Sequence, residues 1–271
     1  MTKNGVIRLR QGRAFSRLEF HNISIYRGSF WMRFIFIFIM MYSMGHVWRI
    51  LYYANPERMG VSLSEIVTYA VMGVALEAVL HFGGPQYYIM DQVRRGTIEM
   101  DILKPIDFQF YMLAKHIGFV LMQFFMIVLP SLVVAYFFFG FNMPSFINGM
   151  AFLLSLFFAC LITFFLKFLL GLISMVTMNI QNIMFGYNAT LRFFSGQIVP
   201  LWLFPGVLGL ISTYLPFRAI YAIPISLYIG RYNGVDIGLA LSAQLFWVGA
   251  LWLVSRLFMK YVFKRLLIQG G

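Results

Sequence analysis

Charged residues are scarce in this sequence, and acidic residues are the scarcest of all. Only 11% of the 271 residues are charged, and nine are aspartate or glutamate. In typical soluble domains about a quarter of the residues are charged, because water must meet a largely polar surface. The shortage therefore excludes a water-soluble globule and indicates that lipid surrounds most of the chain.

The residues that most enzymes need are also lacking. The single cysteine, Cys160, lies in an apolar run, so an internal disulfide or a cysteine-based zinc site is excluded. No lysine follows a glycine, which excludes the phosphate-binding loop of an ATPase. The four histidines are scattered and form no metal-binding or nucleophile motif. We expect no catalytic residue, no metal site and no cofactor bound by this chain.

Long apolar runs are what the sequence has in abundance. About 20 helical residues at 1.5 Å each cross a hydrocarbon core of roughly 30 Å, so such runs predict spanning helices. Six runs qualify, at residues 34–53, 63–82, 117–139, 147–172, 175–200 and 237–258. They predict an all-α membrane protein with six transmembrane helices. A further apolar region, 201–229, contains Pro205, Pro216 and Pro224, which argue against one continuous helix.

The basic residues predict how these spans are oriented, since lysine and arginine accumulate on the cytoplasmic side. Fifteen of the 21 flank the same side of six spans, before the first span, between the second and third, and after the sixth. Both termini are therefore expected in the cytoplasm. Residues 200–232 would then form a re-entrant region on the outer side, where cysteines at Ser212 and Tyr232 should both be reachable. Topology explains the net charge of +12, so no nucleic acid partner is expected.

Residues 1–33 are expected to form a cytoplasmic segment that is not a removable signal peptide. Five apolar side chains fall on one arc of a helix: Phe15, Leu18, Ile25, Tyr26 and Phe30. They predict an amphipathic helix lying in the membrane interface, in contact with lipids. The alternative is an ordinary basic flank in front of the first span.

Ionisable groups inside the spans are few, and each is costly to bury. Glu77 and His81 are four residues apart, so they share a helix face and either line a polar path or make a structural contact. Arg192 could line a substrate path or reach toward the outer surface. Lys167, near the end of the fourth run, is expected to anchor its helix at the interface.

One polar loop carries a recognisable pattern. Residues 91–106 read DQVRRGTIEMDILKPI, with an arginine and glycine followed by Leu-Lys-Pro. This loop resembles the one between the second and third spans of bacterial ABC type-2 exporter permeases, in the branch with six spans. Other matching features occur along nearly the whole chain: Tyr26-Arg27, Gly196 with Pro200 and Pro205, Leu215-Pro216-Phe217, and the final Ile268-Gln269-Gly270-Gly271.

The resemblance implies a complex in the plasma membrane of a prokaryote. A six-helix permease domain, residues 34–271, would pair with a second permease that is identical or homologous. Separate ATPase subunits, binding ATP and magnesium, would dock on a coupling loop at 84–111. The implied coupling residues are Arg94, Arg95, Gly96, Glu99, Asp101, Lys104 and Pro105. Gly96 is expected to allow close backbone approach and Pro105 to stiffen the loop's exit. A solvated basic loop that only maintains topology is the alternative.

The resemblance also implies export of an amphiphilic drug, lipid or peptide between the two permeases. Residues expected along that path are Glu77, His81, Phe185, Arg192 and Phe193. The alternative for the phenylalanines is contact with lipid or neighbouring helices. The alternative for the whole protein is a stand-alone secondary transporter or channel, followed by an intramembrane enzyme or a lipid scaffold.

Overall fold

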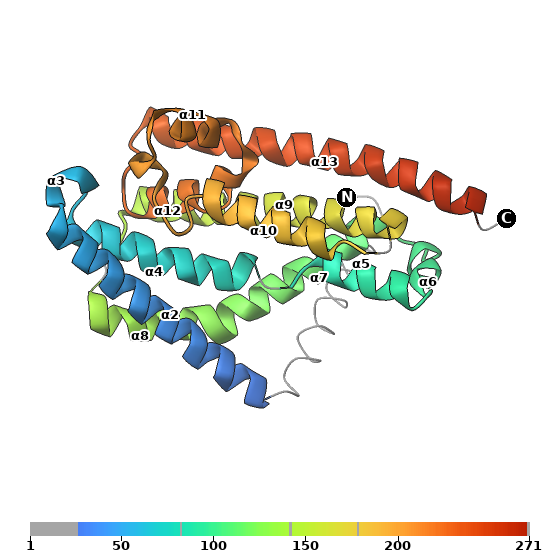
Figure 1. Cartoon of the computed structure of the whole chain (residues 1–271), viewed down its shortest axis with the longest axis horizontal. Coiled ribbons are helices and arrows are strands. Elements are labelled where there is room, and N and C mark those ends of the chain that lie inside the picture. Colours follow the sequence, from blue (N-terminus) through green and yellow to red (C-terminus); the bar gives the residue numbers. More distant parts are fainter. Residues whose placement is uncertain (1–26, 82, 141–142, 178, 270–271) are drawn as a thin grey trace.

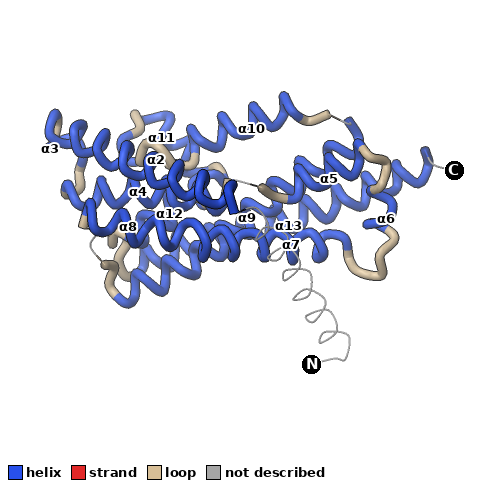
Figure 2. Tube along the Cα trace, turned by 90° about the horizontal axis from the view of Figure 1, so that it is seen from below, coloured by secondary structure: helices blue, strands red, loops and turns tan. Residues whose placement is uncertain are grey.

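The computed structural model describes residues 27–81, 83–140, 143–177 and 179–269 (Figure 1). Helices joined by short loops make up this part of the chain, and no strand occurs in it (Figure 2). The predicted all-α fold is thus confirmed. Most of the predicted interfacial helix, including Phe15, Leu18, Ile25 and Tyr26, lies outside the described residues and stays a prediction. Phe30 falls in the first turn of α2 (Arg27–Ala54).

Five helical stretches are long and apolar enough to cross a membrane. They are Trp31–Ala54, Leu63–Arg94, Phe108–Phe139, Phe146–Thr177 and Val235–Arg265. These match the first, second, third, fourth and sixth predicted spans. The second stretch consists of α4 (Leu63–Leu80) and α5 (Pro85–Arg94). The third consists of α7 (Phe108–Gln123), a π-helical turn η1 (Phe124–Val128) and α8 (Leu129–Phe139).

The predicted fifth span, 175–200, is wrong as one continuous helix. Helix α9 (Phe146–Thr177) takes its first residues, and α10 (Gln181–Phe194) has only 14. Fourteen residues rise about 21 Å, which is too short to cross a core of roughly 30 Å. The helix ends where Gly196 adopts a φ of +75° and its carbonyl accepts a hydrogen bond of 2.5 Å from the Tyr69 hydroxyl. Packing on α4 therefore stops α10 early.

The proline-broken region is not one helix, as predicted. It contains η2 (Leu201–Leu203), α11 (Gly206–Tyr214), η3 (Pro216–Ala219) and α12 (Ala222–Tyr228). The chain bends by 70° between the α11 part and the part that begins at Pro216. This pair is either one additional, broken span or a re-entrant loop. The expectation that Ser212 is reachable is wrong, because its exposed fraction is 0%. Tyr214, which is 73% exposed, is the better reporter.

Helices α4 and α9 form the core. Along α4 most side chains are buried, against α2, α8 and α12, and α9 packs on α5, α12 and α13 (Val235–Gln269). Hydrogen bonds from amide side chains join α13 to its neighbours. The Gln244 amide donates to the carbonyls of Ser155 (3.1 Å) and Ala219 (2.7 Å), and the Gln109 amide donates to the Ser255 hydroxyl (2.8 Å). Such bonds supply the association that the hydrophobic effect cannot provide within lipid.

The two ends of the helix bundle differ in character (Figure 1). At one end lie α3 (Pro56–Met59), the beginning of α4, α11 and α12, and this is called the α3 end. At the other lie α5, α6 (Ile98–Ile102) and the C-terminal part of α13, and this is called the α6 end. The polar loop and the basic C-terminal part of α13 thus share one end, as the sequence requires.

Close packing of α4 against the turn after α10 generates a first prediction. A Cβ at Gly73 would lie 2.5 Å from the Gln197 carbonyl oxygen, so Gly73→Ala must push the turn away from α4. We expect a loss of about 1–3 kcal/mol of stability, the usual cost of overpacking. Thermal unfolding of the purified protein in detergent measures this. Gly249→Ala, where nothing lies within 4 Å of the new atom, is the control. Equal melting temperatures for both variants would contradict the packing described.

Candidate functional site: a helical loop joined to the membrane core

Helices α5 and α6 form a helical hairpin between the membrane core and α7, and glycine builds the turn between them. Gly96 follows the end of α5 and has a φ of +68°. The Gly96 amide donates to the Val93 carbonyl (3.1 Å) and the Thr97 amide to the Gln92 carbonyl (2.9 Å). This bond pair is the Schellman arrangement, which needs a left-handed residue. Nothing in the chain lies within 4 Å of a Cβ placed there, so conformation rather than close approach requires glycine within this chain.

The outer surface of the hairpin combines charge with exposed apolar side chains. Arg94, Arg95 and Glu99 are exposed, and beside them Met100 is 72% and Leu103 is 82% exposed. We call these five residues the loop tip. Sequence reasoning found the charges and missed Met100 and Leu103. The available signal was the pattern of residues 98–103, because Ile98 and Ile102 occupy the inner face and leave the two other apolar residues outside.

Two of the predicted coupling residues bind within the loop instead of facing outward. Asp101 is 5% exposed, and its carboxylate accepts hydrogen bonds from the Tyr88 hydroxyl (2.7 Å) and the Lys104 ammonium (2.6 Å). Lys104 also donates to the Tyr111 hydroxyl (3.2 Å). Partial burial opposes its charge, but bonds to Asp101 and Tyr111 raise the pKa of Lys104 above its ordinary value. These residues hold α6 against α5 and α7, while Pro105 lies exposed just beyond them.

A buried lysine joins the loop to the membrane core. The Lys167 ammonium, on α9, donates to three backbone carbonyls, those of Leu80 (2.6 Å), His81 (2.9 Å) and Gly83 (2.8 Å). These carbonyls belong to the last turn of α4 and the residues after it, where helical partners are missing and the helix dipole is negative. The expectation that Lys167 anchors its helix at the interface is wrong, because the side chain is 1% exposed. The free carbonyls and the negative dipole at the end of α4 attract the Lys167 ammonium into the protein interior.

Glycines let the chain pass close to this lysine. Gly83 and Gly84 have φ values of +70° and +132°, and a Cβ on Gly84 would lie 2.8 Å from Cδ of Lys167. Four residues further into α9, a Cβ on Gly171 would meet Ile89 of α5 at 2.6 Å. Helix α5 therefore packs directly on α9. We call Gly83, Gly84 and Lys167, together with the three carbonyls that Lys167 binds, the α4–α5 joint.

The other end of the loop is tied to the last helix. Asp107 caps α7 by accepting a hydrogen bond of 3.0 Å from the Phe110 amide. The second oxygen of the same carboxylate lies 2.6 Å from the Arg256 guanidinium of α13. Both ends of the loop are thus fixed to the bundle, one through α9 and one through α13.

Two residues of the predicted substrate path meet across α4 and α10. The Glu77 carboxylate and the Arg192 guanidinium are 3.0 Å apart, with side chains 15% and 51% exposed. The buried Tyr221 and the half-buried Tyr187 lie in this region. His81 shares a helix face with Glu77 in sequence, but its carbonyl belongs to the α4–α5 joint. The ion pair is therefore the feature of this face that the sequence did not identify.

Helix α10 presents a mixed surface rather than an apolar one. Phe185 is 78% and Phe193 is 50% exposed, and the Phe193 ring lies 5.4 Å from that of Phe204. Polar side chains share this exposed surface: Gln181, Asn182, Thr190 and Arg192. Polar groups facing hydrocarbon are costly, so such a surface favours protein or a polar path beside α10.

Comparison with known protein families gives one match. A family model described as ABC-2 family transporter protein matches residues 30–270, which is nearly the whole chain. No match was found among curated proteins or among solved structures.

The α4–α5 joint yields a second prediction. Lys167→Met removes three hydrogen bonds and leaves buried carbonyls without a donor, which in comparable buried polar sites costs about 3–5 kcal/mol. We expect a large drop in the melting temperature of the purified protein. Lys260→Met, the same change at an exposed position of α13, is expected to have little effect. If both variants unfold at the same temperature, Lys167 does not hold the joint together.

Proposed function

Because the chain belongs to the ABC-2 transporter family, we propose that it is the permease subunit of an ATP-driven exporter. Its sequence carries no phosphate-binding loop, so a separate ATPase subunit would bind ATP and magnesium. The permease would supply the path through the membrane and the surface on which the ATPase acts. The observation that carries this proposal is the loop tip, where two exposed apolar side chains lie among charges outside the apolar spans.

The loop tip has the composition of a docking surface for another protein. Met100 and Leu103 together offer an apolar centre, and Arg94, Arg95 and Glu99 surround it with charges of both signs. Protein interfaces commonly combine a desolvated apolar centre with a polar rim that sets orientation. Arg95 is already 3.0 Å from Asp91, but exposed pairs of this kind contribute only about 0.3–0.5 kcal/mol and exchange partners easily.

Motion of a docked ATPase would reach the membrane core through the α4–α5 joint. Helix α5 packs on α9 at Gly171, and Lys167 of the same helix holds the end of α4. Gly83 and Gly84 provide backbone freedom between the two. A tilt of the hairpin would therefore shift α4, and with it Glu77 and the ion pair to Arg192.

A second permease subunit, identical or homologous, would cover the mixed surface of α10. The substrate path would lie between the two subunits, with Glu77, Arg192, Phe185 and Phe193 beside it. Phenylalanine rings next to a partly exposed guanidinium suit amphiphilic molecules, so a drug, lipid or peptide is the substrate class we propose. The position of His81 at the joint favours a structural role for it.

We infer that the α6 end faces the cytoplasm of a prokaryotic cell and the α3 end faces outward. Arg94, Arg95 and the basic C-terminal part of α13 lie at the α6 end, which fits the preference of basic residues for the cytoplasmic side. Helices α11 and α12 would then dip into the outer leaflet as a re-entrant pair. The segment before α2 would lie on the inner leaflet.

A stand-alone secondary transporter or channel is the competing function. It requires a cluster of coordinating groups at mid-membrane. Among the nine acidic residues of the sequence Glu77 is the one deep in a span, and Arg192 already neutralises it. The described residues hold no group of three or more metal-binding side chains. Both observations favour the exporter.

The loop tip yields a third prediction. In Met100→Asp/Leu103→Asp the apolar centre becomes charged, so an ATPase subunit of the same host should no longer bind. Affinity purification of the permease from membranes, followed by measurement of co-purifying ATPase activity, tests this. We expect the activity to fall by at least about tenfold, since losing two hot-spot contacts costs more than about 1.4 kcal/mol.

Val235→Asp is the matched control, because it places an acid at an exposed apolar position (79%) at the beginning of α13. It should retain the co-purifying ATPase. Unchanged recovery of ATPase activity with the double variant would contradict docking at the loop tip. Flux driven by an ion gradient through the chain alone, without an ATPase, would contradict the exporter.

A further inference from the structure

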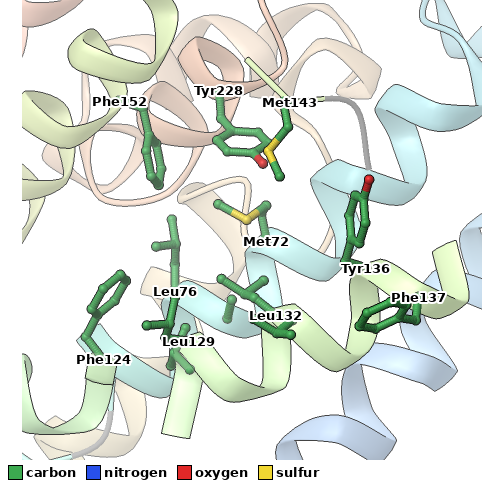
Figure 3. Close-up of a pocket in the computed structure, with 13 residues that line it drawn as sticks. Met72, Leu76, Phe124, Leu129, Leu132, Tyr136, Phe137, Met143, Phe152 and Tyr228 are labelled. Carbon is green, nitrogen blue, oxygen red and sulfur yellow. The ribbon is translucent and has the colours of Figure 1, made fainter. Parts of the chain in front are cut away.

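Two adjacent cavities lie on one side of the core, one apolar and one polar, and together they are called the groove, with an apolar floor and a polar mouth. Its apolar part has a volume of about 320 Å³ and lies between α4, α8, α9 and α12 (Figure 3). The polar part, about 120 Å³, lies at the α3 end. Met143 and Tyr228 line both parts, so the two cavities are direct neighbours. The function proposed above uses neither.

The apolar part opens sideways toward lipid. Leu129, Val133 and Phe137, on the lining face of α8, are 42%, 52% and 81% exposed. The sulfur-bearing side chains of Met72 and Met143 lie near the Tyr228 ring, and Phe124 is at the far end (Figure 3). An occupant must therefore arrive from the bilayer and have an apolar body.

A π-helical turn shapes the floor of the groove. In η1 the Leu129 amide donates to the Phe124 carbonyl, five residues earlier, and Pro130 follows directly. Proline lacks an amide hydrogen and crowds the preceding turn, which explains a wider turn at this place. Such turns are rare and frequent at functional sites. Phe124 and Val128 of this turn line the groove.

Among the described residues that line the mouth there are one acid, several hydrogen-bonding groups and no basic residue. Its polar lining consists of Ser64, Glu65, Thr68, Ser145, Asn148 and Tyr228. One oxygen of Glu65 is used in the capping box of α4, where it accepts a bond of 2.6 Å from the Ser62 amide. The carboxylate nevertheless gives the mouth a negative charge. A cationic group is complementary to it, and hydroxyl and amide donors suit phosphate oxygens.

The length of the groove matches one leaflet. From Glu65 in the mouth to Leu76 on the floor is 11 residues of α4, or about 16 Å at 1.5 Å per residue, close to half of a hydrocarbon core of roughly 30 Å. We propose that the groove is a binding site for a resident membrane phospholipid with an amine-bearing headgroup, its acyl chain along α4 and α8 and its amine beside Glu65. This site is separate from the substrate path at the α4–α10 ion pair.

Photo-crosslinking tests the site on the full-length chain alone, without an ATPase or a transport assay. The protein is placed in nanodiscs of phosphatidylethanolamine and phosphatidylglycerol in equal parts, with a photoactivatable acyl chain on one lipid at a time. Mass spectrometry locates the adducts. We expect the phosphatidylethanolamine adducts to concentrate on groove residues such as Met72 and Leu132. The phosphatidylethanolamine adducts should outnumber the phosphatidylglycerol adducts by about twofold or more, because a single, partly exposed charge pair produces a preference of about that size.

Two variants separate the acyl chain from the headgroup. Leu132→Trp fills the groove and should abolish the concentrated adducts, whereas Leu245→Trp, at a position of α13 that is 57% exposed, should keep them. Glu65→Gln keeps the capping box, since glutamine also serves in it, and should equalise the two lipids. Because this change adds no volume, it remains informative if Leu132→Trp fails to fold.

Adducts spread over all lipid-facing helices, or unchanged in Leu132→Trp, would overturn the site. A lipid preference that persists in Glu65→Gln would overturn the headgroup assignment. Absence of lipid adducts from the groove residues, as expected if a second copy of the chain covers them, would also overturn the site. None of these outcomes bears on docking at the loop tip, so failure here and failure of the exporter function are distinguishable.

Discussion

An ammonium group in the apolar interior of a membrane protein needs an acceptor for each of its three N–H bonds. Lys167 finds all three in the carbonyls of Leu80, His81 and Gly83. The position of the hairpin depends on this contact, because it fixes the end of α4 to α9 while α5 packs on α9 one turn further along. Without it the two halves of the second stretch would be connected only by the four residues 81–84.

Helix α4 is the element that connects the separate features of the molecule. Its end is held at the joint, its last turn carries Glu77 opposite Arg192, and Gly73 near its middle receives the turn after α10. The other side of the same helix lines the lipid groove at Met72 and Leu76. A displacement of α4 would therefore reach both the ion pair and the groove. The proposed coupling route, substrate path and lipid site would therefore all involve one buried helix.

Apolar run length was enough to predict five of the six spans, because lipid selects for about 20 consecutive apolar residues. It failed at 175–200, where the run is long but Gly196 and its bond to Tyr69 end the helix. The length of an apolar run shows where a helix can form in lipid, whereas tertiary packing determines the residue at which that helix ends. The inward position of Lys167 was hidden for a similar reason, since its acceptors lie more than 80 residues away in sequence.

The sequence indicated which loop forms the candidate site but not which of its side chains are exposed. The loop with Arg94 and Gly96 was recognised from its sequence pattern, yet Asp101 and Lys104 bind inside it, and Met100 and Leu103 are exposed. Side-chain direction on a five-residue helix depends on how that helix docks, which sequence periodicity over so few residues does not determine. The pairing of Glu77 with Arg192 likewise required knowledge of which helices are neighbours.

The account depends most on the α6 end being the cytoplasmic end, where an ATPase can reach the loop tip. Labelling of single cysteines in intact cells with a membrane-impermeant maleimide measures this most directly, in a variant whose buried Cys160 is replaced by serine. A cysteine at Leu103 should react only after the cells are opened, and one at Tyr214 should react in intact cells. Labelling of the Leu103 position in intact cells would put the loop tip outside the cell, where no ATPase could bind it.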